Sequence, residues 1–259
     1  MPEGHTIHHA AREHRRSLVG QKLSVSSPQG RFSDGARVLN GQRCLSVEAY
    51  GKHLIYGFAA SHLHVHLGLF GRIRNQKLPI KEPRGAVRVR LIGENDVIDI
   101  NGPTICEIID EQGINFLINR LGPDLIRDDA DSERAFRRIS KSRVQIGKLI
   151  MDQSVMSGIG NIFRTEILWR QGIHPNTIGH NIGRTRLQRL WIDAKKLLER
   201  SVRHNAIITV DSGLEGRSSF EECVNIFGKS KCPRCNGSIK RLVVEGRRLF
   251  VCEICQPLR

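Results

Sequence analysis

Four cysteines near the C-terminal end have the residue type and spacing of a metal site. Cys232 and Cys235 form one C-x₂-C pair, Cys252 and Cys255 form a second, and sixteen residues separate the pairs. Each pair presents two thiolates on one side of a tight turn, and two pairs complete a tetrahedral shell with no open position. We therefore predict a single zinc ion (Zn2+) with a structural rather than a catalytic role.

The segment between the two cysteine pairs has the pattern of a β-hairpin. Strand-like residues run over Ile239–Glu245 and Arg248–Val251, and Gly246 supplies a turn between them. Four basic side chains of this hairpin could contact phosphate groups: Lys240, Arg241, Arg247 and Arg248. A zinc ribbon of this kind suits a nucleic-acid-binding module as well as an enzyme.

A glycine-rich turn in the middle of the chain, Gly158-Ile159-Gly160-Asn161, is a candidate anion site. Its glycines let the backbone approach a ligand and expose N–H groups, and a following helix would direct its N-terminus to the same place. Asn161 could cap that helix or contact a phosphate. Because turns between helices often contain glycine, the motif alone does not separate a structural turn from a binding site.

The charge of the chain favours a polyanionic partner over a merely solvated cationic surface. Its 259 residues contain 41 Lys and Arg against 26 Asp and Glu, which gives a net charge of +15 and a pI near 10.1. Basic side chains that neutralise phosphates release counterions, and this release favours nucleic-acid binding. No apolar stretch reaches the roughly 18 residues of a membrane span, so no membrane contact is expected.

The N-terminus lacks the apolar segment of a secretory signal, which predicts a cytoplasmic protein. In a reducing compartment cysteines bind metals or stay free rather than form disulfides. The three cysteines outside the two pairs have no partner at metal-ligand spacing, and we expect buried free thiols at Cys44, Cys106 and Cys223.

The first 120 residues are expected to form mainly strands, with one helix over Thr6–Val19. Apolar residues alternate with polar ones, the period of a half-buried strand, in three runs: Leu45, Val47, Ala49; Leu63, Val65, Leu67; and Val87, Val89, Leu91. In the second run the polar positions are histidines, namely His62, His64 and His66. We interpret them as a polar strand face, with a metal site as the less favoured alternative.

The pattern becomes helical after the breaker Leu121-Gly122-Pro123-Asp124. A long apolar stripe with helical spacing follows, and it predicts core packing: Leu187, Leu190, Trp191, Ala194, Leu197, Leu198 and Val202. The last forty residues change again, to Cys, Gly, Arg and short strand-like runs.

These motifs together resemble the formamidopyrimidine-DNA glycosylase / endonuclease VIII family. The resemblance runs through almost the whole chain and is carried by Met1–Gly4, Tyr50–Leu54, His66–Gly71, Leu121–Asp124, the run Ile146–Pro175 and the terminal cysteines. It implies an α+β fold with an N-terminal β-sandwich and flanking helices (1–122), a helical helix–two-turn–helix DNA-binding domain (123–222) and a zinc β-ribbon (223–259).

The resemblance also implies a chemistry for the N-terminus. Removal of Met1 would expose Pro2 as a secondary amine, and an α-amino group, with a pKa of about 8, is partly unprotonated at neutral pH. Pro2 would attack C1′ of the damaged nucleotide, expel the base and form a Schiff base, after which β- and δ-elimination cut the strand. Glu3 would transfer protons to and from the sugar.

The other site residues implied by the resemblance contact DNA. Lys52, Asn161 with Gly160, and Arg247 would bind the phosphates around the lesion, and Arg248 is the neighbouring alternative to Arg247. Because the damaged base must leave the stack, Leu69 and Phe70 would fill the gap as an apolar wedge. A core strand end is the alternative interpretation of that pair.

Two departures from the family pattern bear on substrate and efficiency. Thr6 occupies the position that usually holds a second glutamate. The segment Asp99–Thr104, expected as a loop, lacks the Arg and Phe that the formamidopyrimidine branch inserts opposite an oxidised purine, and Leu69-Phe70 replaces that branch's Met. The composition of the Asp99–Thr104 segment and that of the Leu69-Phe70 pair both resemble the endonuclease VIII branch, which removes oxidised pyrimidines.

These sequence features are consistent with three functions. The first is a base excision repair enzyme, a DNA glycosylase and abasic-site lyase acting on double-stranded DNA with oxidised bases or abasic sites. It would be a monomer by default and associated with the bacterial nucleoid through DNA. The second is a damaged-DNA-binding protein without catalysis, which Thr6 favours. The third, an RNA-binding zinc-ribbon protein, leaves Pro2, Leu69 and Phe70 unexplained.

Overall fold

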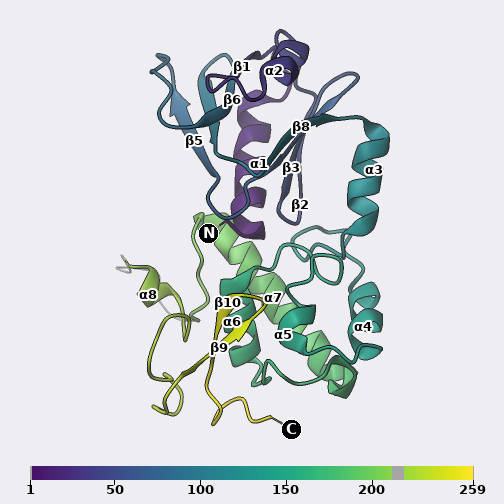
Figure 1. Cartoon of the computed structure of the whole chain (residues 1–259), viewed down its shortest axis with the longest axis vertical. Helices are drawn as coiled ribbons and strands as arrows, with labels where there is room; N and C mark the ends of the chain where they lie inside the picture. The colour runs from purple at the N-terminus through teal and green to yellow at the C-terminus, as the bar shows by residue number, and fades with distance from the viewer. Residues whose placement is uncertain (1, 212–218, 259) are drawn as a thin grey trace. The chain divides into compact units, whose positions relative to one another are not determined.

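The computed structural model describes residues 2–211 and 219–258, and the chain divides into two compact units, Met1–Arg120 and Leu121–Arg259 (Figure 1). Each unit contains its own hydrophobic core. None of the helices in the described ranges is long and apolar enough to cross a membrane. The predicted subdivision of the second unit at residue 222 stays a prediction.

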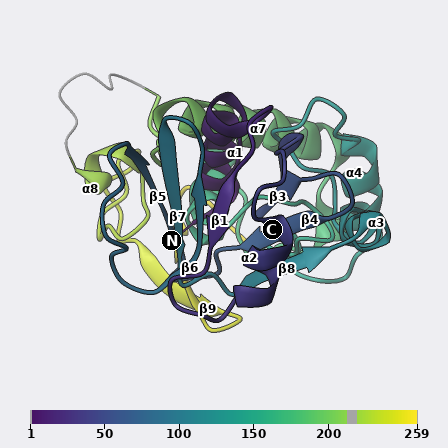
Figure 2. The same cartoon turned by 90° about the horizontal axis from the view of Figure 1, so that it is seen from above.

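Two antiparallel four-stranded sheets form most of the first unit, as the predicted β-sandwich requires. In order across the first sheet the strands are β1 (Ser24–Ser26), β6 (Val87–Ile92), β7 (Asp96–Asn101) and β5 (Arg72–Lys77). In the second they are β2 (Ser46–Tyr50), β3 (His53–Gly57), β4 (His62–His66) and β8 (Ile105–Ile109). Figure 2 shows the two sets of strands as separate groups.

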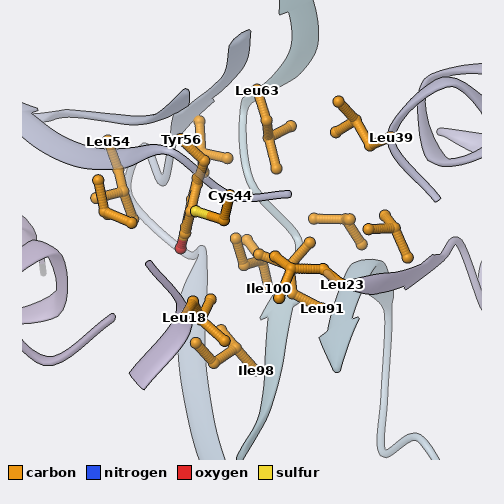
Figure 3. Close-up of a cluster of buried hydrophobic side chains, with 14 of the residues drawn as sticks. Leu18, Leu23, Leu39, Cys44, Leu54, Tyr56, Leu63, Leu91, Ile98 and Ile100 are labelled. Carbon is orange, nitrogen blue, oxygen red and sulfur yellow. The ribbon is translucent and has the colours of Figure 1, made fainter. Parts of the chain in front are cut away.

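The alternating apolar residues explain how the two sheets enclose a core. Most of them are fully buried, and they meet side chains of α1 (Gly4–Leu18) and α2 (Ser33–Leu39) (Figure 3). The predicted helix is thus confirmed, with its start two residues earlier than expected. Leu45 is the exception, since it precedes β2 and is exposed.

α3 (Glu111–Arg120) covers the other face of the second sheet. Ile55 of β3 packs there against Ile114 and Leu117 of the helix. β3 is therefore buried on both faces, which its nearly continuous burial confirms.

A buried ion pair between Arg90 and Asp99 joins β6 to β7. The alternating pattern of β6 predicts instead that Arg90 lies on the polar side of a half-buried strand. Arg90 is 5% exposed and Asp99 is 1% exposed. The guanidinium donates through Nε and Nη2 to both carboxylate oxygens of Asp99, at 2.7 and 2.8 Å, and Gln76 donates to the same carboxylate at 3.0 Å. Asp99 also raises the pKa of Arg90 by accepting these bonds.

The second unit begins with a helical region. Its helices are α4 (Ser132–Ser140), α5 (Ile146–Leu149), α6 (Asn161–Arg170), the 3-10 turn η1 (Gly179–Asn181), α7 (Arg184–His204) and the short α8 (Phe220–Cys223). The predicted apolar stripe is confirmed as the buried face of α7. Its Trp191 contacts Phe136 of α4 edge-to-face, with ring centroids 6.0 Å apart.

The predicted ribbon hairpin is also confirmed. β9 (Lys240–Val244) and β10 (Arg247–Val251) pair in antiparallel register and are joined by two residues. Both of these, Glu245 and Gly246, have positive φ, at 51° and 70°. Such a turn matches the right-handed twist of the strands, and Gly246 adopts its conformation without steric cost.

We expect Asp99→Ala to lower the free energy of unfolding by about 3–5 kcal/mol, because it leaves the Arg90 guanidinium buried without its charge partner. Chemical denaturation measures this loss. Asp34→Ala is the matched control, since Asp34 forms a 3.0 Å pair with Arg37 in which both side chains are exposed. That variant should lose no more than about 1 kcal/mol. Equal losses in the two variants would contradict a structural role for the buried pair.

Candidate functional site

The N-terminal candidates lie at the start of α1. Glu3 precedes the helix as its N-cap residue in extended conformation, and it is fully buried. Its carbonyl accepts a hydrogen bond from the backbone N–H of Thr6 at 3.0 Å. Pro2, next to it, is half-buried. Since glutamate is rarely buried completely without a specific role, its position directly after Pro2 fits an acid–base residue beside a nucleophile.

Thr6, at the position expected to hold a second glutamate, forms a polar, uncharged pair with His5. The hydroxyl of Thr6 lies 3.3 Å from Nε2 of His5. Burial lowers the pKa of His5 to about 3, so its ring is neutral at physiological pH. The first turn of α1 contains no acidic residue.

Lys52 lies in the tight connection between β2 and β3. Tyr50 and His53 are the last paired residues of this hairpin, so Gly51 and Lys52 form a two-residue loop. Gly51 has a φ of 59°, which glycine adopts readily at the first position of such a turn. The loop places a basic side chain at the end of a rigid hairpin.

Leu69 and Phe70 follow β4 and are 45% and 87% exposed. The backbone N–H of Gly71 donates to the carbonyl of Leu67 at 3.0 Å, which closes a tight turn around them. The alternative of a core strand end is therefore wrong. Two apolar side chains displayed on a turn fit an intercalating wedge.

Half of the segment expected as a loop over Asp99–Thr104 is a strand. β7 continues to Asn101, and only Gly102, Pro103 and Thr104 remain before β8 begins. The prediction of a six-residue loop is wrong, because Asp99 to Asn101 pair with both neighbouring strands. The connection itself is too short to carry a long inserted side-chain cluster.

In the second unit, Asn161 is the first residue of α6, and Gly160 is the N-cap. The capping role considered for Asn161 is therefore wrong. Its side-chain oxygen instead accepts a hydrogen bond from Arg164, and its Nδ2 donates to the carbonyl of Arg248 at 2.8 Å. Arg164 is fully buried and also donates to the carbonyl of Gly147 at 3.1 Å.

These bonds bring two predicted elements of the site together. The amide of Asn161 is fixed in one orientation and joins the start of α6 to β10 of the ribbon. Arg247 begins β10 and is half-buried, while the side chain of Arg248 is exposed. The glycine-rich turn and the basic end of the hairpin thus meet at Asn161.

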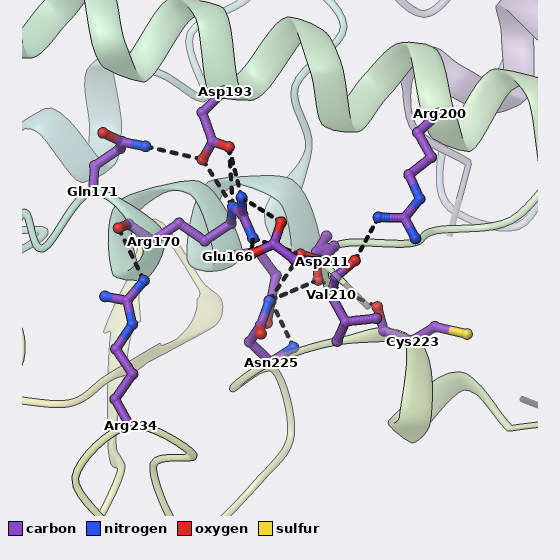
Figure 4. Close-up of polar contacts among 11 residues, drawn as sticks. Glu166, Arg170, Gln171, Asp193, Arg200, Val210, Asp211, Cys223, Asn225 and Arg234 are labelled. Atoms are coloured by element: carbon purple, nitrogen blue, oxygen red, sulfur yellow. Dashed lines mark hydrogen bonds and ion pairs between the residues drawn. The ribbon is translucent and has the colours of Figure 1, made fainter. Parts of the chain in front are cut away.

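A buried carboxylate, that of Glu166 in α6, holds the segment leading to the ribbon (Figure 4). Its oxygens accept the backbone N–H groups of Asn225, Ile226 and Phe227 at 2.8–2.9 Å and the hydroxyl of Thr209 at 2.7 Å. The Asn225 side chain donates to it as well, at 2.9 Å. Such charge-assisted bonds are stronger than neutral ones.

The C-terminal end of α6 contacts α7 and the first cysteine pair. Arg170 pairs with Asp193 of α7 at 2.8 Å (Figure 4). Arg234, between the cysteines of the first pair, donates to the carbonyls of Trp169 and Arg170, and its guanidinium lies 3.9 Å from the centre of the Trp169 ring. Trp169 donates from Nε1 to the sulfur of Cys232 at 3.4 Å.

The four cysteines gather as a metal site requires. The sulfurs of Cys232, Cys235, Cys252 and Cys255 all lie within 4.8 Å of one another, and none forms a disulfide. Across the described parts of the chain, no other group of His, Cys, Asp or Glu has metal-binding geometry, so the alternative of a histidine metal site is not supported. Of the remaining cysteines, Cys44 is buried, whereas Cys106 and Cys223 are partly exposed.

Arg164 and Glu166 are the residues that sequence reasoning missed. Both belong to the run Ile146–Pro175, but charged residues in a helix are normally solvated, and α6 shows no apolar stripe that would assign them to a buried face. The packing of α6 between the ribbon and the helical core makes nine of its ten residues buried.

Comparisons with known proteins give a consistent result. The Formamidopyrimidine-DNA glycosylase N-terminal domain family matches residues 1–101, and the Formamidopyrimidine-DNA glycosylase H2TH domain family matches residues 121–212. Endonuclease 8 1 of Mycobacterium tuberculosis is 40% identical over 99% of this chain and 100% of its own length. Formamidopyrimidine-DNA glycosylase of Psychromonas ingrahamii is 28% identical over 91% of this chain and 88% of its own length.

Solved structures share the fold. Lactococcus lactis Fpg (MutM), in a complex with DNA containing N7-benzyl-Fapy-dG, superposes with a TM-score of 0.83 at 23% identity. The superposition covers 99% of this chain and 100% of that one. The same enzyme in complex with DNA containing an abasic site gives the same score.

We expect Glu166→Ala to release the segment that precedes the ribbon. The substitution leaves the N–H groups of Asn225, Ile226 and Phe227 without an acceptor, at about 1–3 kcal/mol each. Hydrogen–deuterium exchange should show faster exchange at these amides. Glu199→Ala on α7 is the control, because Glu199 forms only a partly exposed pair with Lys195 at 3.8 Å. Unchanged exchange in Glu166→Ala would contradict the role of this carboxylate.

Proposed function

The chain belongs to the formamidopyrimidine-DNA glycosylase / endonuclease VIII family of DNA repair glycosylases, and from that premise we propose that it removes oxidised bases from double-stranded DNA and cleaves the abasic site left behind. Pro2 would be the nucleophile of both steps. The observation that carries this proposal is the complete burial of Glu3 directly after Pro2 at the start of α1.

The first step displaces the damaged base. Once Met1 is removed, the Pro2 nitrogen attacks C1′, and the bond between C1′ and the base breaks as the base leaves with a proton. Glu3 protonates the sugar ring oxygen, so the ring opens and an iminium forms between Pro2 and C1′. Because the base must first leave the stack, Leu69 and Phe70 would take its place.

The second step cuts the strand. The iminium withdraws electrons from the sugar, so loss of a proton from C2′ expels the 3′ phosphate, and a further elimination expels the 5′ phosphate. Glu3 would shuttle these protons. Water then hydrolyses the iminium and restores the free Pro2 amine.

Each unit contains its own candidate groups for binding DNA phosphates. Lys52 provides a cation at the end of a hairpin. The backbone N–H of Gly160 and the second hydrogen on Nδ2 of Asn161 provide neutral donors, and Arg247 provides a cation from the ribbon, with Arg248 as its neighbouring alternative.

Oxidised pyrimidines are the proposed substrate class. Support comes from the connection Gly102–Thr104, because its three residues leave little chain to reach the base opposite an oxidised purine. The identity of 40% to an endonuclease 8, against 28% to the Psychromonas formamidopyrimidine-DNA glycosylase, points the same way.

We further propose that the four-cysteine cluster holds zinc. A set of four thiolates in tetrahedral reach is the ligand set of structural zinc, and it leaves no position for substrate. Zinc bound there would fix the relative positions of the two cysteine pairs. It would thereby hold β10 and Arg247 against α6.

Borohydride trapping tests the nucleophile. Wild type should form a covalent adduct with a duplex containing an abasic site, and Pro2→Gly should lower strand cleavage by about 100-fold or more, since covalent catalysis is impaired. Binding to the same duplex should stay within about threefold of wild type. Lesion duplexes with an oxidised pyrimidine or 8-oxoguanine rank the substrates.

Equal trapping by both proteins would refute Pro2 as the nucleophile. The absence of an adduct with wild type on every duplex would support the DNA-binding protein without catalysis, the function that Thr6 favours.

Removal of one thiolate tests the metal. Cys235→Ser should bind no zinc by mass spectrometry and should bind DNA more weakly, because metal binding and ribbon folding are coupled. Cys223→Ser, outside the cluster, is the control and should keep a full complement of zinc. Full zinc content in Cys235→Ser would rule out the proposed ligand set.

A further inference from the structure

A line of polar residues crosses the second sheet of the first unit, on the face that α3 covers. His53 of β3 and His64 of β4 are 6% and 3% exposed. Ile55, which lies opposite His64 in the register, packs against α3 on the same face. The register places His53 opposite His66, and His64 opposite Glu107 of β8. A buried polar group costs free energy unless it is hydrogen-bonded, so this line has to be held by specific bonds.

Two hydrogen bonds connect the line. Nδ1 of His64 lies 2.9 Å from the carboxylate of Glu107, and Nδ1 of His53 lies 2.9 Å from Nε2 of His64. A carboxylate only accepts, so His64 donates from Nδ1, and its Nε2 must accept a hydrogen bond from the Nδ1–H of His53. Glu107 thereby sets the tautomer of both rings.

The tautomer of His66 is fixed from the other side. The backbone N–H of Gly68 donates to its Nδ1 at 3.1 Å, so a neutral His66 carries its proton on Nε2. The His53 ring is tilted against both neighbours, with centroids 5.1 Å from His64 and 4.8 Å from His66. His53 is thus held between two rings and by one directed bond.

All three rings are neutral at physiological pH. Burial lowers the pKa of His53 to about 3 and that of His66 to about 4, and it lowers the pKa of His64 as well. The cations Lys52 and Arg120 contribute to the shifts of His53 and His66. His53 and His66 therefore add no charge of their own near Lys52.

Glu107, the carboxylate of this line, lies on β8 and orients the rings through His64. The ring of His53, the residue that follows Lys52 in the sequence, is locked in place by its bond to His64.

We propose that His53 and His64 are positioning residues that, together with Glu107, hold the Gly51-Lys52 turn in the conformation in which Lys52 contacts a DNA phosphate. This inference rests on the phosphate-binding role proposed above for Lys52. Neither histidine touches DNA in this scheme, and both act through the hairpin.

A double-mutant cycle between Lys52 and His53 tests the proposal, with affinity for a duplex containing an abasic-site analogue measured over a range of salt concentrations. Lys52→Ala should lower the slope of log K against log salt by about 0.9, as loss of one phosphate contact does. His53→Leu should weaken binding about tenfold and lower the slope similarly, because the turn is no longer held. In the Lys52→Ala background, His53→Leu should cause almost no further loss of DNA affinity.

Two further variants separate positioning from folding. His53→Asn places an amide N–H where Nδ1–H of the ring lies, so it should restore most of the affinity and the slope. His62→Leu is the matched control, because His62 lies on β4, the strand of His64, and bonds to Glu111 at 3.1 Å near the surface. His62→Leu should leave the slope unchanged. Glu107→Gln should weaken DNA binding, whereas its control Glu111→Gln should not.

The outcomes distinguish the two proposals. If Lys52→Ala leaves affinity and slope unchanged, the phosphate contact proposed for Lys52 is wrong. If Lys52→Ala has its expected effect but His53→Leu matches His62→Leu, or costs as much in the Lys52→Ala background as alone, the positioning role is overturned.

Discussion

The second unit depends on one buried carboxylate, that of Glu166. A charge without water needs several hydrogen bonds, and three consecutive backbone N–H groups, from Asn225 to Phe227, supply most of them. The same helix begins with Asn161, whose amide is bonded to β10. The start and the middle of α6 are thereby attached to the ribbon and to the chain before it. These polar bonds add to the apolar cluster that Trp169 of α6 forms with Ile226 and Phe250.

The candidate site residues share a structural position. Lys52, Leu69 with Phe70, Gly160 and Arg247 all lie in turns or at the first residue of an element, while the strands and helices behind them are buried. Turns can present side chains and N–H groups to a ligand, and the packed elements set where they point. The proposed chemistry at Pro2 uses the same device, since α1 begins directly after the buried Glu3.

Buried charged and polar groups serve two different purposes in this protein. Arg90 and Asp99 satisfy each other and join two strands, and Arg164 satisfies backbone and side-chain oxygens around Asn161. The histidines of the second sheet are instead kept neutral by burial. A protein with a net charge of +15 can in this way keep its cations at the surface for phosphates, while polar groups inside direct the geometry.

From the sequence alone, the resemblance of its motifs to a known family determined the family and the α+β fold with its sandwich and ribbon. Alternation, the helical stripe and C-x₂-C spacing located individual strands, the stripe of α7 and the cysteine cluster, because they are local patterns that report local structure. The sequence also located the Gly160-Asn161 turn. Only the tertiary structure decided that Asn161 does not cap its helix, that Asp99 belongs to a strand and pairs with Arg90, and that Arg164, Glu166, His53 and His64 are buried. These residues are polar by type, and their partners include groups that lie 9 to 87 positions away in the chain. No local pattern can report such partners, because a buried polar side chain is stabilised by the groups that surround it and not by its neighbours in sequence.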